Sequence, residues 1–121
     1  MAAKKLTSKE QFLQFASGLK RVEAVEVFGA KAFIRVMSGS QRESYEAFVM
    51  SKQGKDGKIG DIKGLRSKLV SLTLCDAEGN LLDVSPDEVN EMDGLLVEEL
   101  FSAAQRVNKL GDAGAGEAEK N

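Results

Sequence analysis

The sequence predicts an α+β fold, in which a small antiparallel sheet of two hairpins is packed by three to four helices. The sheet is predicted from residues 22–37 and 69–84, where β-branched and other apolar residues alternate with polar ones on either side of Gly-containing turns. The helices are predicted from residues 8–19, 41–51 and 86–110, where apolar residues recur every three or four positions.

The length and composition are those of one small domain. The chain has 121 residues, 42% hydrophobic and 30% charged, which is enough to bury a modest core. We expect residues 1–110 to form a single domain. Residues 111–121 contain no large apolar residue, so we expect a disordered C-terminal tail.

The first third of the chain predicts a helix and then a hairpin. Thr7 and Glu10 have the spacing of a capping box, which predicts a helix over residues 8–19. Two runs of strand-forming residues follow, and residues 29–31 separate them as a loop that contains Gly.

The middle of the chain predicts a second helix and a loop. Ser40 and Glu43 form another candidate capping box, at the start of a helix over residues 41–51. Residues 51–64 hold four glycines and four lysines, which predicts a flexible, mostly basic loop. A short helical segment near residues 61–68 then leads into the next strand.

Residues 69–75 carry the clearest strand pattern, with Val, Leu and Leu on one face and Ser and Thr on the other. Residues 76–80 have the composition of a turn, and residues 81–84 return as a short strand. Ser85 followed by Pro86 predicts the start of a helix, with Ser as the cap and Pro at the first helical position.

The last helix is predicted to bend or restart near residues 93–94 and to reach residue 110, with Gly111 as its C-terminal stop. The face we expect to be buried is Leu96, Leu100, Ala104 and Val107.

The composition argues against several functions. The chain has no His, which removes the commonest general base and metal ligand. Its 17 basic and 19 acidic residues show none of the basic excess of nucleic-acid-binding proteins. No stretch approaches the length of a membrane span, and nothing resembles a signal peptide. We therefore expect a soluble cytoplasmic protein that binds neither nucleic acid nor membrane.

No motif in the chain predicts a catalytic, cofactor or metal site. The glycine-rich loop lacks the Gly-Lys-Ser/Thr of a phosphate-binding loop. The carboxylates near Asp76 lack the bidentate Glu of a calcium loop, so a hairpin turn is the better interpretation. The single Cys75 lies in an apolar run and is predicted to be a small buried side chain.

The segment from Arg66 to Leu110 resembles the tail assembly chaperones of long-tailed phages. The resemblance lies in the order and spacing of Arg66, Leu69-Val70, Asp76-x-x-Gly79-Asn80, Leu81-Leu82, Val89 and Ala103-Ala104-x-x-Val107-Asn108. The Gly-Lys loop before Arg66 departs from the family pattern as an insertion.

The resemblance implies an interaction protein and not an enzyme. Its partner would be the tape measure protein, a very long and largely helical chain, which many copies keep soluble while the tail tube assembles. The chaperone would be absent from the mature virion, and we expect homo-oligomers. The candidate partner-binding residues are Arg66, Val97, Phe101 and Arg106.

The family also commonly makes an extended form by ribosomal frameshifting, which is thought to recruit the tail tube protein. Glu119-Lys120-Asn121 can be written in codons that contain an A-AAA-AAY slippery heptamer, so such a form is an expectation for this gene. Two alternatives stay open. One is another small phage morphogenesis protein, such as a head–tail joining or tail terminator protein that remains in the virion. The other is a small enzyme or ligand-binding domain.

Overall fold

The computed structural model describes residues 3–53 and 64–110. The predicted tail of residues 111–121, including the expected helix stop at Gly111, lies outside the described residues, as do residues 54–63 of the Gly-Lys loop.

The described residues confirm an α+β fold with an antiparallel sheet of three strands, in the spatial order β1-β2-β3. The elements are α1 (Lys9–Ser17), β1 (Val22–Val27), β2 (Ala30–Arg35), α2 (Gly39–Ser51), α3 (Leu65–Thr73), β3 (Leu74–Cys75), α4 (Pro86–Asn90) and α5 (Gly94–Val107).

The first predicted hairpin is formed by β1 and β2, whose register runs from Val22 opposite Arg35 to Val27 opposite Ala30. Its turn is the two residues Phe28 and Gly29, both with positive φ, and not the predicted residues 29–31. Two positive φ values match the right-handed twist of paired strands, which is why such turns are favoured in hairpins.

The second predicted hairpin is much reduced. The two residues of β3 pair with Phe33 and Ile34 of β2, and beyond them one bridge joins Cys75 to Leu81. Asp83 has a φ of 60°, which takes the chain out of extended conformation soon after that bridge.

Residues 69–75, predicted as a strand, are mostly helical, and this prediction is wrong. Four of the five buried side chains of α3 recur with the spacing of one helix face: Leu65, Leu69, Val70 and Thr73. The alternation of apolar and polar residues led to the wrong prediction. Leu72, which a strand would place in the core, is only partly buried. Helix α3 packs against α2, α4 and α5, and this packing outweighs the strand propensity of the run.

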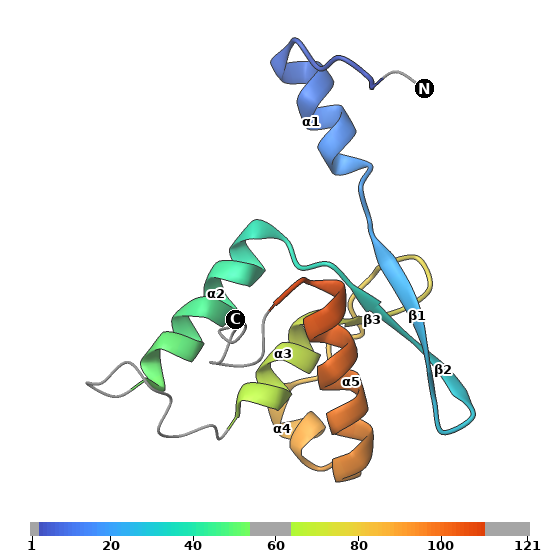
Figure 1. Cartoon of the computed structure of the whole chain (residues 1–121), viewed down its shortest axis with the longest axis vertical. Coiled ribbons are helices and arrows are strands. Elements are labelled where there is room, and N and C mark those ends of the chain that lie inside the picture. The colour runs from blue at the N-terminus through green and yellow to red at the C-terminus, as the bar shows by residue number, and fades with distance from the viewer. Residues whose placement is uncertain (1–2, 54–63, 111–121) are drawn as a thin grey trace, which may run out of the picture.

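Helix α5 forms the centre of the fold. It packs against β1 and β2 on one side and against α3 on the other (Figure 1). Leu100 and Ala104 are buried as predicted, whereas Leu96 and Val107 are partly buried against the same core. The predicted break before α5 is confirmed, because the carboxylate of Asp93 accepts hydrogen bonds from the N–H groups of Leu95 and Leu96.

The helix caps lie one or two residues from the predicted ones at two sites. Ser8 and not Thr7 caps α1, and Ser38 and not Ser40 caps α2, where Gln41 completes a capping box. The cap of α4 by Ser85 is as predicted, with Pro86 at the first helical position.

Helix α5 ends three residues before the predicted position, in a Schellman motif. Lys109 takes the left-handed conformation with a φ of 55°, and the N–H of Leu110 donates to the carbonyl of Gln105. The Asn108 side chain then joins this end to the sheet, because its Nδ2 donates to the carbonyl of Arg35, the last residue of β2, and its Oδ1 accepts from the N–H of Met37 at 2.7 Å.

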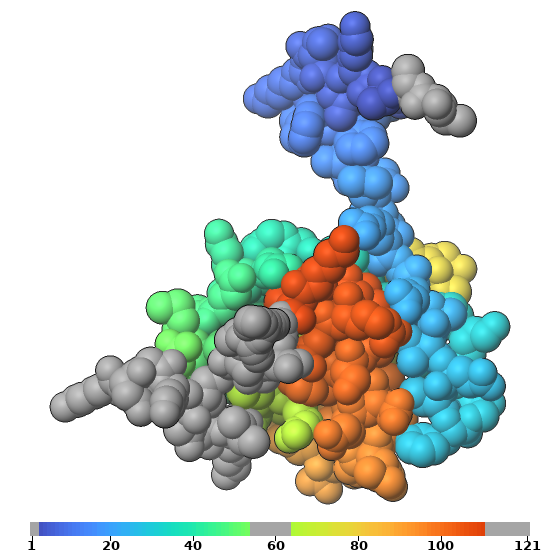
Figure 2. All heavy atoms as spheres, in the orientation of Figure 1, coloured from blue at the N-terminus to red at the C-terminus, as the bar shows by residue number. Residues whose placement is uncertain are grey.

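Helix α1 stands away from the rest of the molecule. Figure 1 shows it beyond the start of β1, and Figure 2 shows it joined to the body by a narrow neck. None of its nine residues is buried. The described residues therefore consist of a body and a projecting N-terminal helix.

Candidate partner-binding surfaces

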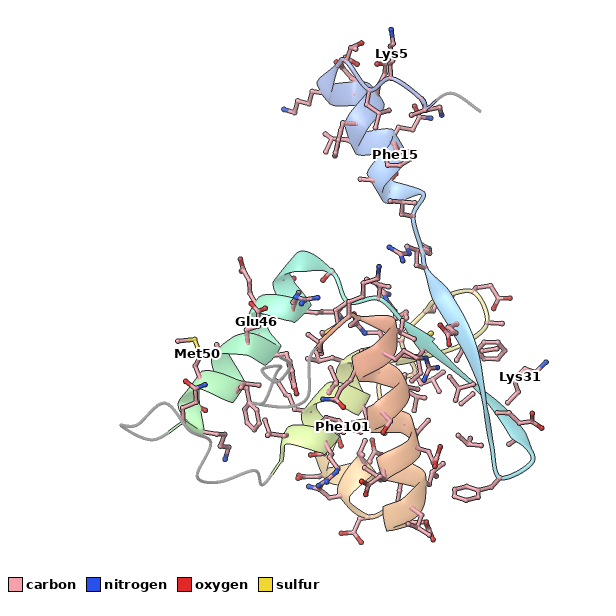
Figure 3. The ribbon with its side chains drawn as sticks, viewed as in Figure 1. Lys5, Phe15, Lys31, Glu46, Met50 and Phe101 are labelled. Atoms are coloured by element: carbon pink, nitrogen blue, oxygen red, sulfur yellow. The ribbon has the colours of Figure 1, made fainter. Side chains whose placement is uncertain are left out.

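The first candidate surface is the apolar face of α1. Four large apolar side chains, each 42–56% exposed, lie on this helix or directly after it: Phe12, Leu13, Phe15 and Leu19. The rings of Phe12 and Phe15 pack edge to face with centroids 6.4 Å apart, so they form one continuous patch. Figure 3 shows Phe15 on α1, well away from the body. Exposed apolar patches are common at interaction sites, so this face is a candidate for one.

The second candidate surface is an apolar groove of about 590 Å³. It runs between the turn half of the β1-β2 hairpin, β3 with the residues after it, and the first half of α5. The residues that decide its character are Phe28 and Phe33 from the hairpin, Leu82 from the following loop, and Leu96 and Leu100 from α5. Phe28 and Leu82 are well exposed, so the groove opens to solvent.

The third candidate surface is a more polar hollow on the other side of α5, between that helix and the start of α3. It is lined by Arg66 together with Leu95, Val97 and Glu98. Leu95 is 68% exposed. Arg66 lies 3.9 Å from Glu98, which is a long ion pair between two exposed side chains and contributes little to stability.

The structure brings together three of the four predicted partner-binding residues. Arg66 and Val97 line the same hollow, and the guanidinium of Arg66 lies over the ring of Phe101 at 5.7 Å from its centroid. Phe101 itself is only 9% exposed and belongs to the core. Arg106 is separate from them and pairs with Glu23 of β1 at 2.7 Å.

Phe12, Phe15 and Phe28 are exposed, although the sequence pattern does not identify them as surface residues. Helical spacing in residues 8–19 predicts an apolar face, but it cannot say whether another element covers that face. Phe28 was predicted as part of a strand, whereas it occupies an exposed turn. No local signal distinguishes these cases, because exposure depends on where distant elements pack.

Cys75 is buried, as predicted. Burial raises the pKa of its thiol above the ordinary value; Arg35 lowers that pKa and Asp76 raises it further. A thiol held in its neutral form is a poor nucleophile, so Cys75 serves packing.

Asp76 organises the turn of residues 76–80, as the sequence indicates. Its carboxylate accepts hydrogen bonds from the N–H groups of Glu78 and Asn80, each at 2.9 Å. The bond from Asn80 is the main reason why the pKa of Asp76 lies below its ordinary value. Gly79 is required here, because its φ is 91° and a Cβ would lie 3.2 Å from Val22.

Within residues 3–53 and 64–110, no group of three or more His, Cys, Asp or Glu side chains is placed to hold a metal ion. Over the same residues, no helix has the length and apolar character needed to cross a membrane.

Comparisons with known proteins found no relative of this chain. No protein-family model matches the chain, and neither the curated proteins nor the solved structures gave a match.

Proposed function

We propose that the protein is a phage tail assembly chaperone, which binds the tape measure protein, keeps it soluble and promotes tail tube assembly. The structural observation that carries the proposal is the amount of large apolar surface that this small domain leaves in solvent, on α1 and in the groove. Surfaces of this kind bind other proteins. The resemblance from Arg66 to Leu110 implies that the partner, called the client below, is the tape measure protein.

The residues that carry the resemblance hold the fold together. Asn108 links the end of α5 to the sheet, and Ala103 and Ala104 of that helix are buried in the core. Asp76 and Asn80 close the turn that leads out of β3. Because these positions are structural, the resemblance supports a body fold shared with the tail assembly chaperones.

The hollow beside α5 is our candidate for the client contact. Leu95 offers an apolar side chain to a client helix. Arg66 can exchange its long contact with Glu98 for a carboxylate of the client, because the bond it gives up is weak. Phe101 holds the guanidinium in place for that exchange through its ring face.

Co-expression with the tape measure protein of the same phage tests the proposal. The soluble yield of the tape measure protein should rise when the wild-type chain is present. Leu95→Asp should reduce this gain, because it places a charge against the apolar client. Met50→Asp is the matched control, since Met50 is also 68% exposed but lies on α2 (Figure 3).

Both substitutions are at exposed positions, so neither should unfold the body. A wild-type chain that leaves the yield unchanged would overturn the function. If both variants reduced the gain in soluble yield equally, or if neither reduced it, the hollow would not be the contact with the client.

A further inference from the structure

Charge is segregated along the chain. Residues 3–21, which include α1, hold five basic residues and one acidic residue, whereas residues 22–110 hold eleven basic and fifteen acidic residues. The net charge of the whole chain is -2, so its composition conceals a basic N-terminal segment. Within the described residues, none of the five basic side chains of this segment forms an ion pair. A negatively charged partner surface therefore complements this segment better than it complements the body.

The basic side chains lie beside the apolar face of α1. Lys4 and Lys5 line one small hollow together with Phe15. Lys9 precedes Phe12 by three residues, so these two side chains lie on one side of the helix. The opposite side of the helix is polar and carries Glu10, Gln14 and Ser17. An apolar face with Phe and Leu, bordered by lysines, is typical of helices that lie flat in the headgroup region of a membrane.

We propose that α1 is a surface anchor that binds an anionic lipid bilayer. The exposed side chains of Phe12, Phe15 and Leu19 enter the boundary between headgroups and acyl chains, and the neighbouring lysines contact the negative headgroups. Buried apolar area and positive charge both strengthen binding of this kind. The sequence predicts no membrane contact because it contains no membrane span, but a helix that lies on the surface needs none.

The position of α1 allows this contact. Figure 2 shows α1 joined to the body by a narrow neck, and none of its residues is buried against the body. The helix can therefore lie on a flat surface without the body coming between them. The body carries the acidic excess, so an anionic bilayer attracts α1 and repels the rest of the chain. The hollow and the groove both belong to the body, so membrane contact through α1 is independent of the tape measure protein.

A lipid surface accounts for the apolar side chains as well as for the charge. The phosphates of a nucleic acid would complement the lysines, but they would leave the exposed rings of Phe12 and Phe15 without an apolar partner. An acidic protein would need a groove shaped to fit α1, whereas a bilayer surface accommodates an amphipathic helix without such a groove.

Flotation of the full chain with lipid vesicles tests the proposal. At about 50 mM salt, the chain should bind vesicles of phosphatidylcholine with phosphatidylserine at least about 10-fold more tightly than vesicles of phosphatidylcholine alone. Lys5→Gln should weaken binding to the anionic vesicles about 5-fold, since one basic residue near such a surface contributes about 1 kcal/mol. Lys31→Gln, which changes an exposed lysine of β2, is the matched control and should bind as wild type (Figure 3).

The apolar part of the contact has its own pair of variants. Phe15→Ser should weaken binding about 10-fold, because the bilayer covers the exposed part of this ring in the wild-type chain. Phe28→Ser removes a ring that is 68% exposed at the hairpin turn, and it should leave binding unchanged. Neither ring is buried, so the circular dichroism of both variants should match that of the wild type. Phe12→Ser replaces Phe15→Ser if that variant fails to fold.

Four results would overturn the proposal. A wild-type chain that does not float with the anionic vesicles would leave the face of α1 to a protein partner. Equal binding to anionic and neutral vesicles would show that the basic residues play no part. Controls that weaken binding as much as the α1 variants would place the contact on the body. Binding of double-stranded DNA at the same salt, as tight as that of the anionic vesicles, would make α1 a site for polyanions in general.

Discussion

Asn108 joins three elements through its buried side-chain amide and its backbone carbonyl. Its Oδ1 accepts from Met37, its Nδ2 donates to the carbonyls of Ala104 and Arg35, and its own carbonyl accepts from Arg42 of α2. A short polar side chain with one acceptor and two donor hydrogens suits this position, and no apolar residue can replace those bonds.

Asn108→Ala should lower the free energy of unfolding by about 2–3 kcal/mol, because it leaves the buried N–H of Met37 without a partner. Urea unfolding followed by circular dichroism measures the change. Asn90→Ala, at an exposed position in α4, is the control and should stay within about 0.5 kcal/mol of wild type. Equal effects at the two positions would contradict the role of Asn108.

Asp76 makes a pH-dependent contribution whose sign follows from its hydrogen bonds. Its pKa is lowered in the folded state, chiefly by the N–H of Asn80, so the ionised carboxylate stabilises the fold. That contribution is present above the ordinary carboxyl pKa of 3.8 and is lost as the pH falls through the lower folded value.

The free energies of unfolding of wild type and Asp76→Asn should therefore converge as the pH falls from about 5 to about 2. Glu78→Gln removes a charge from the same turn but leaves the Asp76 acceptor, so it should keep the wild-type pH dependence. A constant difference between wild type and Asp76→Asn across this range would show that the turn does not depend on the carboxylate.

Element boundaries show where sequence-based prediction succeeds and where it fails. The break at Asp93 and the start at Ser85 are predicted well, because capping is a local interaction between a side chain and the N–H groups of the next turn. The start of α3 falls within the helical segment predicted near residues 61–68, but its second half was missed because residues 69–75 alternate like a strand and the helix has no side-chain cap. Its conformation is decided by packing against α2, α4 and α5, which are distant in sequence.

Gly64 is the residue that allows α3 to begin where it does. Its φ is +86°, and a Cβ there would lie 3.2 Å from the ring of Phe48. Gly64→Ala should cost about 1–2 kcal/mol in the free energy of unfolding. Gly94→Ala is the matched control at the start of α5, where a Cβ meets nothing within 4 Å.

The control should be neutral or stabilising by up to about 1 kcal/mol, since Ala restricts the unfolded chain more than Gly does. Thermal unfolding of both variants separates the two expectations. If Gly64→Ala were as stable as Gly94→Ala, the result would contradict the left-handed conformation of Gly64 before α3.

Helix α5 should respond to substitution according to its two faces. Leu100 is 3% exposed and packs between the sheet and α3, so Leu100→Ala should cost about 2–5 kcal/mol. Leu95→Ala, one and a half turns earlier on the exposed side, should change stability by less than about 0.5 kcal/mol. Chemical unfolding measures both, and a small cost at Leu100 would mean that the sheet does not cover this face.

At the scale of the molecule, the sequence predicts the candidate surfaces only in part. Arg66 and Val97 are both predicted from the sequence as partner-binding residues, and both line the same hollow. The groove could not be predicted, because Phe33, Leu82 and Leu96 come from three separate segments. The exposure of α1 could not be predicted either, since an amphipathic helix has the same sequence pattern whether a core covers it or not.

The proposed function makes a prediction about the finished phage particle. A chaperone covers apolar surface on the tape measure protein, and the tail tube must later enclose that same protein. The two coverings compete for one surface, so the chaperone has to leave as the tube grows. Purified virions should therefore lack this chain, while lysates from cells in mid-infection contain it together with the tape measure protein.

Quantitative mass spectrometry of purified particles, with the tail tube protein as the internal standard, measures this directly. The tape measure protein provides the matched comparison, because the tail tube encloses it and it should therefore remain in every virion. A copy number of this chain comparable to a ring at the head–tail junction would contradict the chaperone function. It would favour instead a joining or terminator protein, whose exposed α1 would then be covered by neighbouring subunits of the particle.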